Sequence, residues 1–386
     1  MPKHPHRLPD FCMSDFKQFD SFKDLLCRYE KFDFQTYIKN VTFDDIEKSL
    51  SKDRLSEFDF LNLISKKAVN FLEEMALLSR KRYLRHFGRV IQLYIPIYIS
   101  NYCSSDCSYC GFSKKNKIIR KHLTEDEIEK EAKEIAKTGI KHILILTGEA
   151  KKIADLNYIK MAVTVLKKYF SSIAIEIYPL DTDEYKELKK AGVDSLTVYQ
   201  EVYDKTIYKE VHTSGEKRDY FYRLDTPERG AKAGFRAINI GVLFGLGDIQ
   251  KEAFFSAIHA KYLMDKYLEC EISLSLPRIN HAEGNYEPKY ILNDKTFLQI
   301  MLAYRLYMPM IGINISTRER AEFRDNLIGL GATKLSAGSK TDVGGYEGKD
   351  TSTPQFDISD KRSVQEIVKV IKQKGHQPIF KDWEMI

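Results

Sequence analysis

The stretch IQLYIPIYISNYCSSDCSYCGF, residues 91–112, places three cysteines directly after a run of apolar, β-forming residues. The run at 91–99 predicts a buried strand. Cys103, Cys107 and Cys110 follow its carboxyl end, separated from one another by three and then two residues. The rest of the chain decides in which fold this strand lies and what the cysteines do.

Seven more short apolar runs follow, and amphipathic segments separate them. We predict strands at 142–147, 173–180, 195–200, 237–244, 271–276, 312–316 and 333–338. We predict helices at 125–138, 155–169, 183–191, 217–233, 249–268, 294–307 and 319–330. A capping box of Thr124 and Glu127 begins the first of these helices, and Gly139 ends it. Eight βα units favour an α/β fold of the closed (β/α)8 TIM type, in which function lies at the carboxyl ends of the strands.

The barrel pattern is preceded by a helical region. Residues 65–87 carry apolar positions at three- and four-residue spacing, which predicts a helix. We therefore expect an N-terminal helical extension over 1–90, a barrel over 91–340, and a C-terminal segment over 341–386 that packs on the barrel. The extension is expected to cover the bottom or the side of the barrel.

The composition excludes several classes of protein. Hydrophobic residues make up 43% and charged residues 30% of the 386 residues, as in a folded globular protein. The net charge of +6 is small for this length, and no basic, aromatic-rich motif of a nucleic-acid module occurs, so we expect no nucleic-acid partner. No apolar run is long enough to span a membrane, and the first residues lack a signal-peptide core. We expect a cytoplasmic protein.

Clustered cysteines in a reducing compartment are more often metal ligands or catalysts than disulfides. A structural zinc ion needs a fourth ligand, and His122 is the only local candidate. A cubane iron-sulfur cluster has four iron corners. A loop that supplies three thiolates would leave one iron open for a substrate or a cofactor. Both hypotheses remain open on the residues alone.

A dense basic run, KKNKIIRKH at 114–122, follows the cysteines immediately. Such a run is usually a solvated loop. Beside a redox centre it is also suited to dock an acidic electron carrier by charge complementarity.

The spacing in CSSDCSYC, residues 103–110, resembles the C-x3-C-x-aromatic-C signature of the radical S-adenosylmethionine (SAM) enzymes. The resemblance implies that Cys103, Cys107 and Cys110 bind a [4Fe-4S] cluster whose fourth iron chelates the amino and carboxylate groups of SAM. One electron then splits SAM into methionine and a 5′-deoxyadenosyl radical, which abstracts hydrogen from the substrate.

The resemblance also implies a set of SAM-binding residues on the neighbouring strands. Gly148 and Glu149 in LTGE are similar to the motif that meets the methionine amino group, although Thr147 replaces its first glycine. Arg223 resembles an arginine that pairs with the SAM carboxylate, and Tyr109 is expected to cover SAM near the adenine. The remaining expected contacts, to the ribose and the adenine, are Glu176, Tyr178, Gln200, Glu201 and Leu243.

The similarity extends to the aromatic amino acid lyases within this superfamily. Segments that carry it lie at 96–112, 175–180, 199–204, 241–248, 313–320, 336–346 and 377–384. Within that group the chain is most similar to the tyrosine lyases of thiamine biosynthesis. The expected reaction is cleavage of the Cα–Cβ bond of L-tyrosine to p-cresol and 2-iminoacetate (dehydroglycine), which feeds thiazole formation.

Three alternatives accompany this expectation. A related lyase acting on tryptophan has the same scaffold. The hydrogenase-maturation tyrosine lyases carry a second cysteine-ligated cluster in a C-terminal extension, which is disfavoured because no cysteine follows Cys270. A non-enzymatic, zinc-stabilised scaffold protein with a basic docking face is the alternative from a different class.

The expected reaction requires the amino acid to be clamped with its backbone toward SAM. By analogy with the group, Arg318 is expected to bind the substrate carboxylate as a bidentate donor. An ion pair with Glu319 or Asp325 is the alternative for this arginine. Ser336 and Ser339 are expected to add hydrogen bonds to the substrate. Tyr98 is expected to form one wall of the substrate site.

The expected partners are L-tyrosine, an acidic flavodoxin or ferredoxin as electron donor, and thiazole synthase, with which the family forms a complex.

Overall fold

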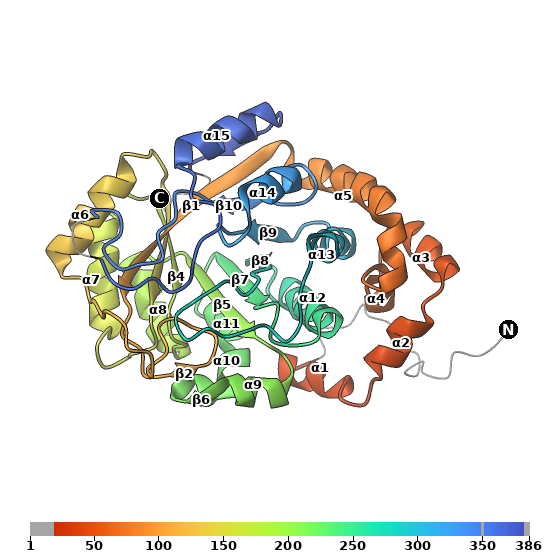
Figure 1. Cartoon of the computed structure of the whole chain (residues 1–386), viewed down its shortest axis with the longest axis horizontal. Helices are drawn as coiled ribbons and strands as arrows, with labels where there is room; N and C mark the ends of the chain where they lie inside the picture. Colours follow the sequence, from red (N-terminus) through yellow and green to blue (C-terminus); the bar gives the residue numbers. More distant parts are fainter. Residues whose placement is uncertain (1–18, 349–350, 382–386) are drawn as a thin grey trace.

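A computed structural model describes residues 19–348 and 351–381. Eight parallel strands form a closed barrel (Figure 1): β1 (Val90–Ser100), β3 (His142–Thr147), β4 (Ser172–Glu176), β5 (Ser195–Glu201), β7 (Ala237–Val242), β8 (Glu271–Ser275), β9 (Gly312–Ile315) and β10 (Lys334–Ser336). The barrel closes where β10 pairs with β1, with Gln92 opposite Lys334 and Tyr94 opposite Ser336. The predicted (β/α)8 fold is confirmed.

Helices surround the barrel on its outside. They are α6 (Glu125–Ala136), α7 (Leu156–Leu166), α8 (Thr182–Ala191), α11 (Thr226–Lys232), α12 (Ile249–Lys266), α13 (Asp294–Tyr307) and α14 (Ala321–Leu327). Helix α6 has the predicted capping box, in which Thr124 accepts from the Glu127 N–H and the Glu127 carboxylate accepts from the Thr124 N–H. Gly139 has a φ of 85°, a left-handed conformation that suits glycine at the end of a helix.

The predicted helix at 217–233 is wrong as a single element. The structure instead has a short 3-10 turn, η3 (Glu216–Arg218), and helices α10 (Tyr220–Leu224) and α11. The break falls at Asp225, which ends α10 and precedes Pro227 at the start of α11. A proline is tolerated in the first turn of a helix but not in its interior, so one continuous helix is not formed.

Several short elements were not predicted. They are α9 (Lys205–Val211), the two-stranded pair β2 (Asp106–Cys107) and β6 (His212–Ser214), α15 (Val364–Gln373) and β11 (Gln377–Ile379). Strand β11 pairs in parallel with the start of β1, at Val90–Gln92, on the outside of the barrel closure. Strand β1 therefore has partners on both sides along its length, β3 and β10 within the barrel and β11 at its base.

The helices before the barrel lie on its side. They are α1 (Phe22–Arg28), α2 (Phe34–Asn40), α3 (Phe43–Leu50), α4 (Glu57–Leu63), η2 (Lys66–Phe71) and α5 (Leu72–Phe87). In Figure 1 they form an arc around α12 and α13. Ring contacts join the two layers, with Phe60 stacked on Tyr304 of α13 and Phe22 on His259 of α12. These contacts place the N-terminal helices against the side of the barrel; the division into an extension to residue 90, a barrel to residue 340 and a C-terminal segment stays a prediction.

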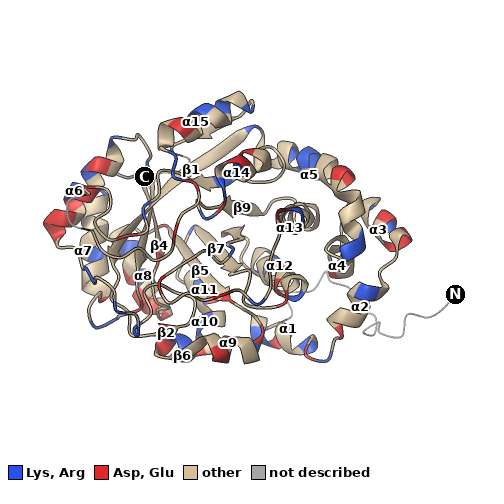
Figure 2. Ribbon diagram, in the orientation of Figure 1, with Lys and Arg blue, Asp and Glu red and all other residues tan. Residues whose placement is uncertain are grey.

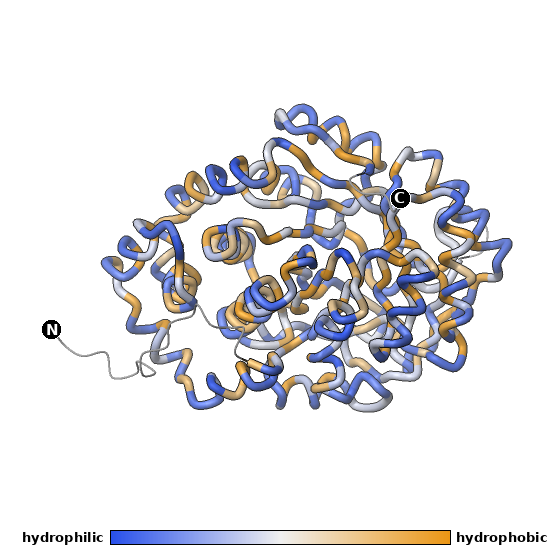
Figure 3. The backbone as a smooth tube through the Cα atoms, turned by 180° about the vertical axis from the view of Figure 1, so that it is seen from behind, coloured by the Kyte–Doolittle hydropathy of each residue, from blue (hydrophilic) through white to orange (hydrophobic). Residues whose placement is uncertain are grey.

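The polarity of the chain follows this architecture. Hydrophobic segments gather in the strands and on the inward faces of the helices (Figure 3), and charged residues are common on the outer helices (Figure 2). Among the helices that the structure describes, none is both long enough and apolar enough to cross a membrane.

Candidate active site

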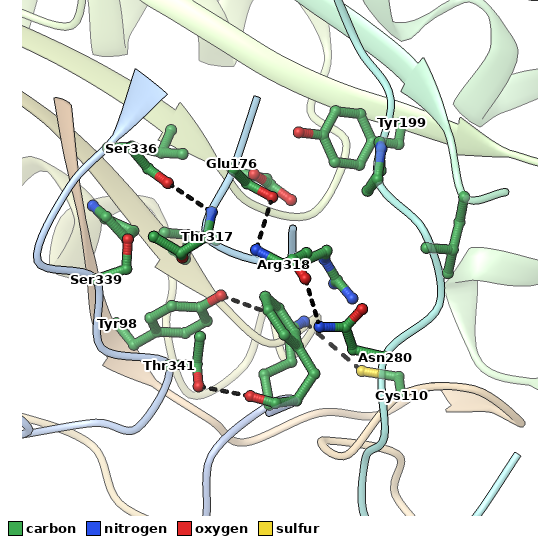
Figure 4. Close-up of a pocket in the computed structure, with 18 of the residues that line it drawn as sticks. Tyr98, Cys110, Glu176, Tyr199, Asn280, Thr317, Arg318, Ser336, Ser339 and Thr341 are labelled. Carbon is green, nitrogen blue, oxygen red and sulfur yellow. Dashed lines mark hydrogen bonds between the residues drawn. The ribbon is translucent and has the colours of Figure 1, made fainter. Parts of the chain in front are cut away.

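A cavity that is partly open to solvent lies within the mouth of the barrel at the carboxyl ends of the strands (Figure 4). Nine of the predicted site residues line it: Tyr98, Tyr109, Cys110, Glu176, Glu201, Leu243, Arg318, Ser336 and Ser339. The other seven do not line this cavity: Cys103, Cys107, Gly148, Glu149, Tyr178, Gln200 and Arg223.

The cysteine loop is held in place by backbone hydrogen bonds. The Ser104 N–H donates to Glu149 O at 2.8 Å, beyond β3, and the Ser108 N–H donates to Val211 O at 2.9 Å. The guanidinium of Arg120 supports the loop from below, donating to the carbonyls of Asn101, Phe112 and Ser113 at 2.6 to 2.8 Å. The basic run after the cysteines is therefore in part structural.

The three thiols lie in an environment that favours a bound cation. Burial raises the pKa of Cys103 to about 11, and the neighbouring Cys110 adds to the effect. Burial likewise raises the pKa of Cys107 and of Cys110. Thiolates at these positions need positive charge close by to be stable, which metal ligation supplies.

Among the residues that the structure describes, no three His, Cys, Asp or Glu side chains converge on a point where they could hold one metal ion. A single zinc ion requires such convergence. A cubane cluster does not, because each cysteine ligates a different iron. His122, the local zinc candidate, stacks on Tyr158 with ring centroids 4.0 Å apart. Three thiols without a fourth ligand fit a [4Fe-4S] cluster that has one open iron.

Beside the cysteines lies a buried cluster of two acids and two bases. Arg223 donates to Glu149 Oε1 at 2.8 Å and lies 3.5 Å from Glu201. Lys217 contacts Glu201 at 2.8 Å and lies 3.8 Å from Glu149. Burial opposes ionisation of Glu201, but Lys217 and Arg223 outweigh it and lower its pKa. Glu149, Glu201 and Arg223, three of the predicted SAM-binding residues, thus come together from separate elements.

Lys217 is a site residue that the sequence analysis missed. Its side chain is only 11% exposed, lines the cavity, and lies 5.8 Å from the centre of the Tyr109 ring. The signal that could have found it is its position six residues before Arg223, in the segment that follows β6.

Two acceptor atoms at the neighbouring strand ends have no partner among the described residues. Glu149 Oε2 and Gln200 Oε1 are both buried without a hydrogen bond. Buried polar atoms are normally paired, so each is suited to accept from a bound group. The amino group and the ribose hydroxyls of SAM are donors of the right kind.

Gly148 is required by close packing. A Cβ there would lie 2.3 Å from Tyr102 O and 3.2 Å from the Cys103 Cβ. Any side chain would push the strand end away from the cysteine loop.

Tyr109 is fixed by a chain of hydrogen bonds. Its hydroxyl lies 2.8 Å from His212 Nε2, and His212 Nδ1 lies 2.8 Å from Tyr208 O. Because only an N–H can satisfy the carbonyl, Nε2 accepts from Tyr109. Burial lowers the pKa of His212 to about 3, in keeping with a neutral ring.

Tyr178 lies apart from the cavity. It is buried two residues beyond β4, and its hydroxyl donates to Ala154 O at 2.5 Å. This bond joins the loops that follow β3 and β4, a structural task. The predicted contact of Tyr178 with SAM has no support in this position.

Arg318 lies in the loop after β9 with its guanidinium carbon 3.3 Å from the centre of the Phe356 ring. In the described part of the chain it has no carboxylate within ion-pair distance. The alternative partners are engaged elsewhere, Glu319 with Arg278 and Asp325 with Arg362. The guanidinium is thus held by stacking and left able to bind an anion in the cavity.

The remaining predicted substrate residues lie around Arg318 (Figure 4). Tyr98 donates to Gln355 Oε1 at 2.8 Å. Ser336 Oγ accepts from the Thr317 N–H at 3.0 Å, whereas Ser339 Oγ is buried without a partner in the described residues. Burial and the charge of Glu201 raise the pKa of Glu176 to about 7. The cavity therefore contains a guanidinium cation, a carboxyl group with a raised pKa, and a serine hydroxyl that has no hydrogen-bond partner among the described residues.

Comparison with known proteins agrees with this site. Residues 97–257 match the model of the radical SAM superfamily, and residues 275–377 match that of the biotin and thiamin synthesis associated domain. The 2-iminoacetate synthases of Salmonella typhimurium and Escherichia coli are each 36% identical over 365 residues, which cover 94% of this chain and 97% of the relative. The chain belongs to the 2-iminoacetate synthase family.

This family member is a radical SAM enzyme, and its cofactors are a [4Fe-4S] cluster and SAM. A crystal structure of the [FeFe]-hydrogenase maturase HydG superposes with a TM-score of 0.82 at 29% identity, covering 95% of this chain and 81% of HydG. HydG from Carboxydothermus hydrogenoformans gives a TM-score of 0.81 at 31% identity, covering 93% and 83%. The zinc-scaffold hypothesis is therefore wrong.

Proposed function

We propose that the enzyme cleaves the Cα–Cβ bond of L-tyrosine to p-cresol and 2-iminoacetate for thiamine thiazole biosynthesis, consuming SAM to 5′-deoxyadenosine and methionine. The family supports the reaction. The observation that carries the substrate class is Arg318, a cation without a carboxylate partner among the described residues, in a cavity that Cys110 also lines. A guanidinium in such a place suits the carboxylate of an amino acid.

The cluster and SAM, when bound, supply one-electron chemistry that abstracts a hydrogen atom from the substrate. The side chains of the cavity hold the substrate in a fixed position relative to SAM. Arg318 binds the substrate carboxylate, Ser339 Oγ offers a hydrogen bond, and Tyr98 walls the cavity on the side of the cysteines. Such positioning controls the rate, because a small misplacement of the reacting atoms is costly.

Four residues are suited to hold SAM itself. Glu149 Oε2 would accept from the amino group, and Arg223 and Lys217 provide positive charge for the carboxylate. Gln200 Oε1 would accept from a ribose hydroxyl. Arg223 and Lys217 are paired with Glu149 and Glu201, and this pairing would hold the SAM-binding side chains in place before SAM binds.

Product identification tests the proposal. The protein is reconstituted with iron and sulfide without oxygen, and should then hold about four irons per chain. Incubation with SAM, dithionite and labelled L-tyrosine should yield labelled p-cresol and 2-iminoacetate. A complete cluster that cleaves SAM but forms no p-cresol would reject tyrosine as substrate, and an indole product from tryptophan would favour the related tryptophan lyase.

We further propose that the enzyme is cytoplasmic and takes its electron from an acidic flavodoxin or ferredoxin. Lys114, Lys115 and Lys117 are exposed beside the cysteine loop, which supports a docking role. A complex with thiazole synthase is proposed from the family alone. It would be tested by co-purification of the two proteins under anaerobic conditions.

A further inference from the structure

A strap of the C-terminal segment, residues 351–360, crosses the mouth of the barrel. Its backbone N–H groups donate to the loops that follow three different strands, at Ile119 O, His281 O and Thr317 O. The family motif at the cysteines does not include this strap, and the sequence analysis assigned no site residue to it. It nevertheless contacts both the cysteine loop and the substrate cavity.

Gln355 is the residue of the strap that lies against the cysteines. Its Oε1 accepts from the Tyr98 hydroxyl at 2.8 Å, and its Nε2 donates to Cys110 Sγ at 3.7 Å (Figure 4). Its backbone oxygen accepts from the Gly111 N–H at 3.1 Å. A Cβ on Gly111 would lie 2.5 Å from that oxygen, so the glycine permits this close approach.

The orientation of the Gln355 amide follows from chemistry. A thiolate can only accept a hydrogen bond, so the amide must direct its N–H toward Cys110. The carbonyl oxygen then faces Tyr98, whose hydroxyl donates to it. The Tyr98 bond and the Cys110 bond therefore support each other, and both are partly buried, which strengthens a hydrogen bond relative to one in water.

An N–H donor to a ligating sulfur affects the redox behaviour of a cluster. Reduction adds one electron, and the negative charge spreads onto the sulfurs. A hydrogen bond to sulfur stabilises that added charge, and hydrogen bonds of this kind are among the features that set cluster potentials. Removing the donor should make the cluster harder to reduce.

We propose that Gln355 is a positioning residue that raises the reduction potential of the cluster through Cys110, and that Tyr98 orients it from the wall of the substrate cavity. The inference rests on the proposed ligation of the cluster by Cys110. The next residue of the strap, Phe356, stacks on Arg318, so one segment supports both the cluster ligand and the substrate cation.

Gln355→Met tests the inference, because methionine has a similar length but neither donates nor accepts strongly. The midpoint potential of the reconstituted cluster is measured by an EPR-monitored titration with dithionite, without SAM or tyrosine. The potential of the variant should be lower than that of the wild type. Gln355→Glu keeps an acceptor for Tyr98 but loses the donor, and should also lower it. An unchanged potential in Gln355→Met would overturn the inference.

Gln373→Met is the matched control, because Gln373 is exposed on α15, and its potential should equal that of the wild type. If Gln355→Met takes up less iron than the wild type, Tyr98→Phe decides. This change keeps the amide donor but frees its orientation, and should lower the potential by a smaller amount. No shift in Tyr98→Phe would then reject the inference.

The outcome is separable from that of the proposed reaction, because the titration contains no substrate. A wild type that forms no p-cresol, combined with a lowered potential in Gln355→Met, would reject tyrosine and keep the inference. A Cys110→Ser protein with an unchanged iron content and potential would reject the ligation on which the inference rests.

Discussion

At the scale of single residues, the site depends on charges that are held in place before a ligand binds. Arg318 is stacked on Phe356, and the bases Arg223 and Lys217 are paired with Glu149 and Glu201. These two arrangements prepare the cavity for two different anionic groups, and each can be tested by a single substitution.

Arg318→Lys should raise the L-tyrosine concentration needed for half-maximal p-cresol formation roughly tenfold or more, which corresponds to about 1.4 kcal/mol of lost binding. Lysine loses the bidentate geometry and the planar contact with Phe356. SAM affinity, measured by equilibrium binding, should not change. Arg320→Lys serves as control, because Arg320 is exposed and pairs with Asp294. An unchanged tyrosine dependence would remove Arg318 from the site.

Lys217→Met should lower the free energy of unfolding by about 3 kcal/mol, because it leaves the buried carboxylates of Glu149 and Glu201 to share Arg223. Adding Glu201→Gln should recover part of this loss, since it removes one of the two negative charges. Anaerobic denaturant titrations of the three proteins provide the measurement. Equal stability of the single variant and the wild type would show that Lys217 does not stabilise the buried carboxylates.

The site residues that the sequence alone can point to are those with short-range motifs. Cys103, Cys107 and Cys110 are marked by their spacing, and Glu149 by its place directly after a strand. Gln355 was missed because its partner Cys110 is 245 residues away, and Lys217 because it stands at the start of the predicted helix 217–233, where no motif marks it. No periodicity or local motif records a contact of that separation.

At the scale of elements, the strap 351–360 joins several of the loops that follow the strands. The strap 351–360 bonds to the loops after β1, β8 and β9, and the side chains of Asp357 and His281 add a contact of 2.9 Å. This pair connects the strap to the loop after β8, and its histidine has a shifted pKa.

The His281–Asp357 contact should make a small part of the stability pH-dependent. Hydrogen bonds to Asp357 and Asn285 raise the pKa of His281 above its ordinary value of 6.5. A raised histidine pKa gives stability that is fully present below pH 6.5 and is lost as the pH rises through the folded-state pKa. His281→Gln should therefore lower the melting temperature at pH 6 and have little effect at pH 9.

Thermal unfolding of both proteins across this range is the measurement, and the effect is expected to be modest because the pair is exposed. Lys289→Gln, which removes an exposed pair with Glu210, is a control whose effect should not change between the two values of pH. A His281→Gln effect that is the same at pH 6 and pH 9 would contradict the expectation.

Elements with strong local patterns were predicted closely. The strand at 142–147 and the helix at 294–307 have the same bounds in the structure. Strand β11 was not predicted, because three residues carry no alternation and its partner, β1, lies far away in sequence. Pro227 marks the division of 217–233 into α10 and α11, which the periodicity of the segment does not reveal.

At the scale of the whole molecule, one face of the barrel carries the chemistry and one side carries the N-terminal helices. The arc of helices α1 to α5 covers α12 and α13 and leaves the mouth of the barrel free of them. The exposed lysines beside the cysteine loop are then available for a partner at the mouth.

Replacing Lys114, Lys115 and Lys117 by glutamate should slow cluster reduction by an acidic flavodoxin at least tenfold at low salt, and should leave reduction by dithionite unchanged. Electrostatic docking also predicts that the difference shrinks as the ionic strength rises. Stopped-flow absorbance follows both reactions. The same three changes at Lys369, Lys372 and Lys374, exposed on or next to α15, form the control. Equal slowing with both reductants would mean that the lysines support the cluster itself.

The contact between Cys110 and Gln355 has a consequence for how the protein is made. A ribosome synthesises the cysteine loop within the first third of the chain, but Gln355 and the strand β11 that pairs with β1 emerge only in the last tenth. Until then the start of β1 lacks its pairing with β11, and Cys110 lacks its contact with Gln355. We therefore expect a nascent chain stalled before residue 355 to leave Cys110 more accessible to solvent than it is in the finished fold.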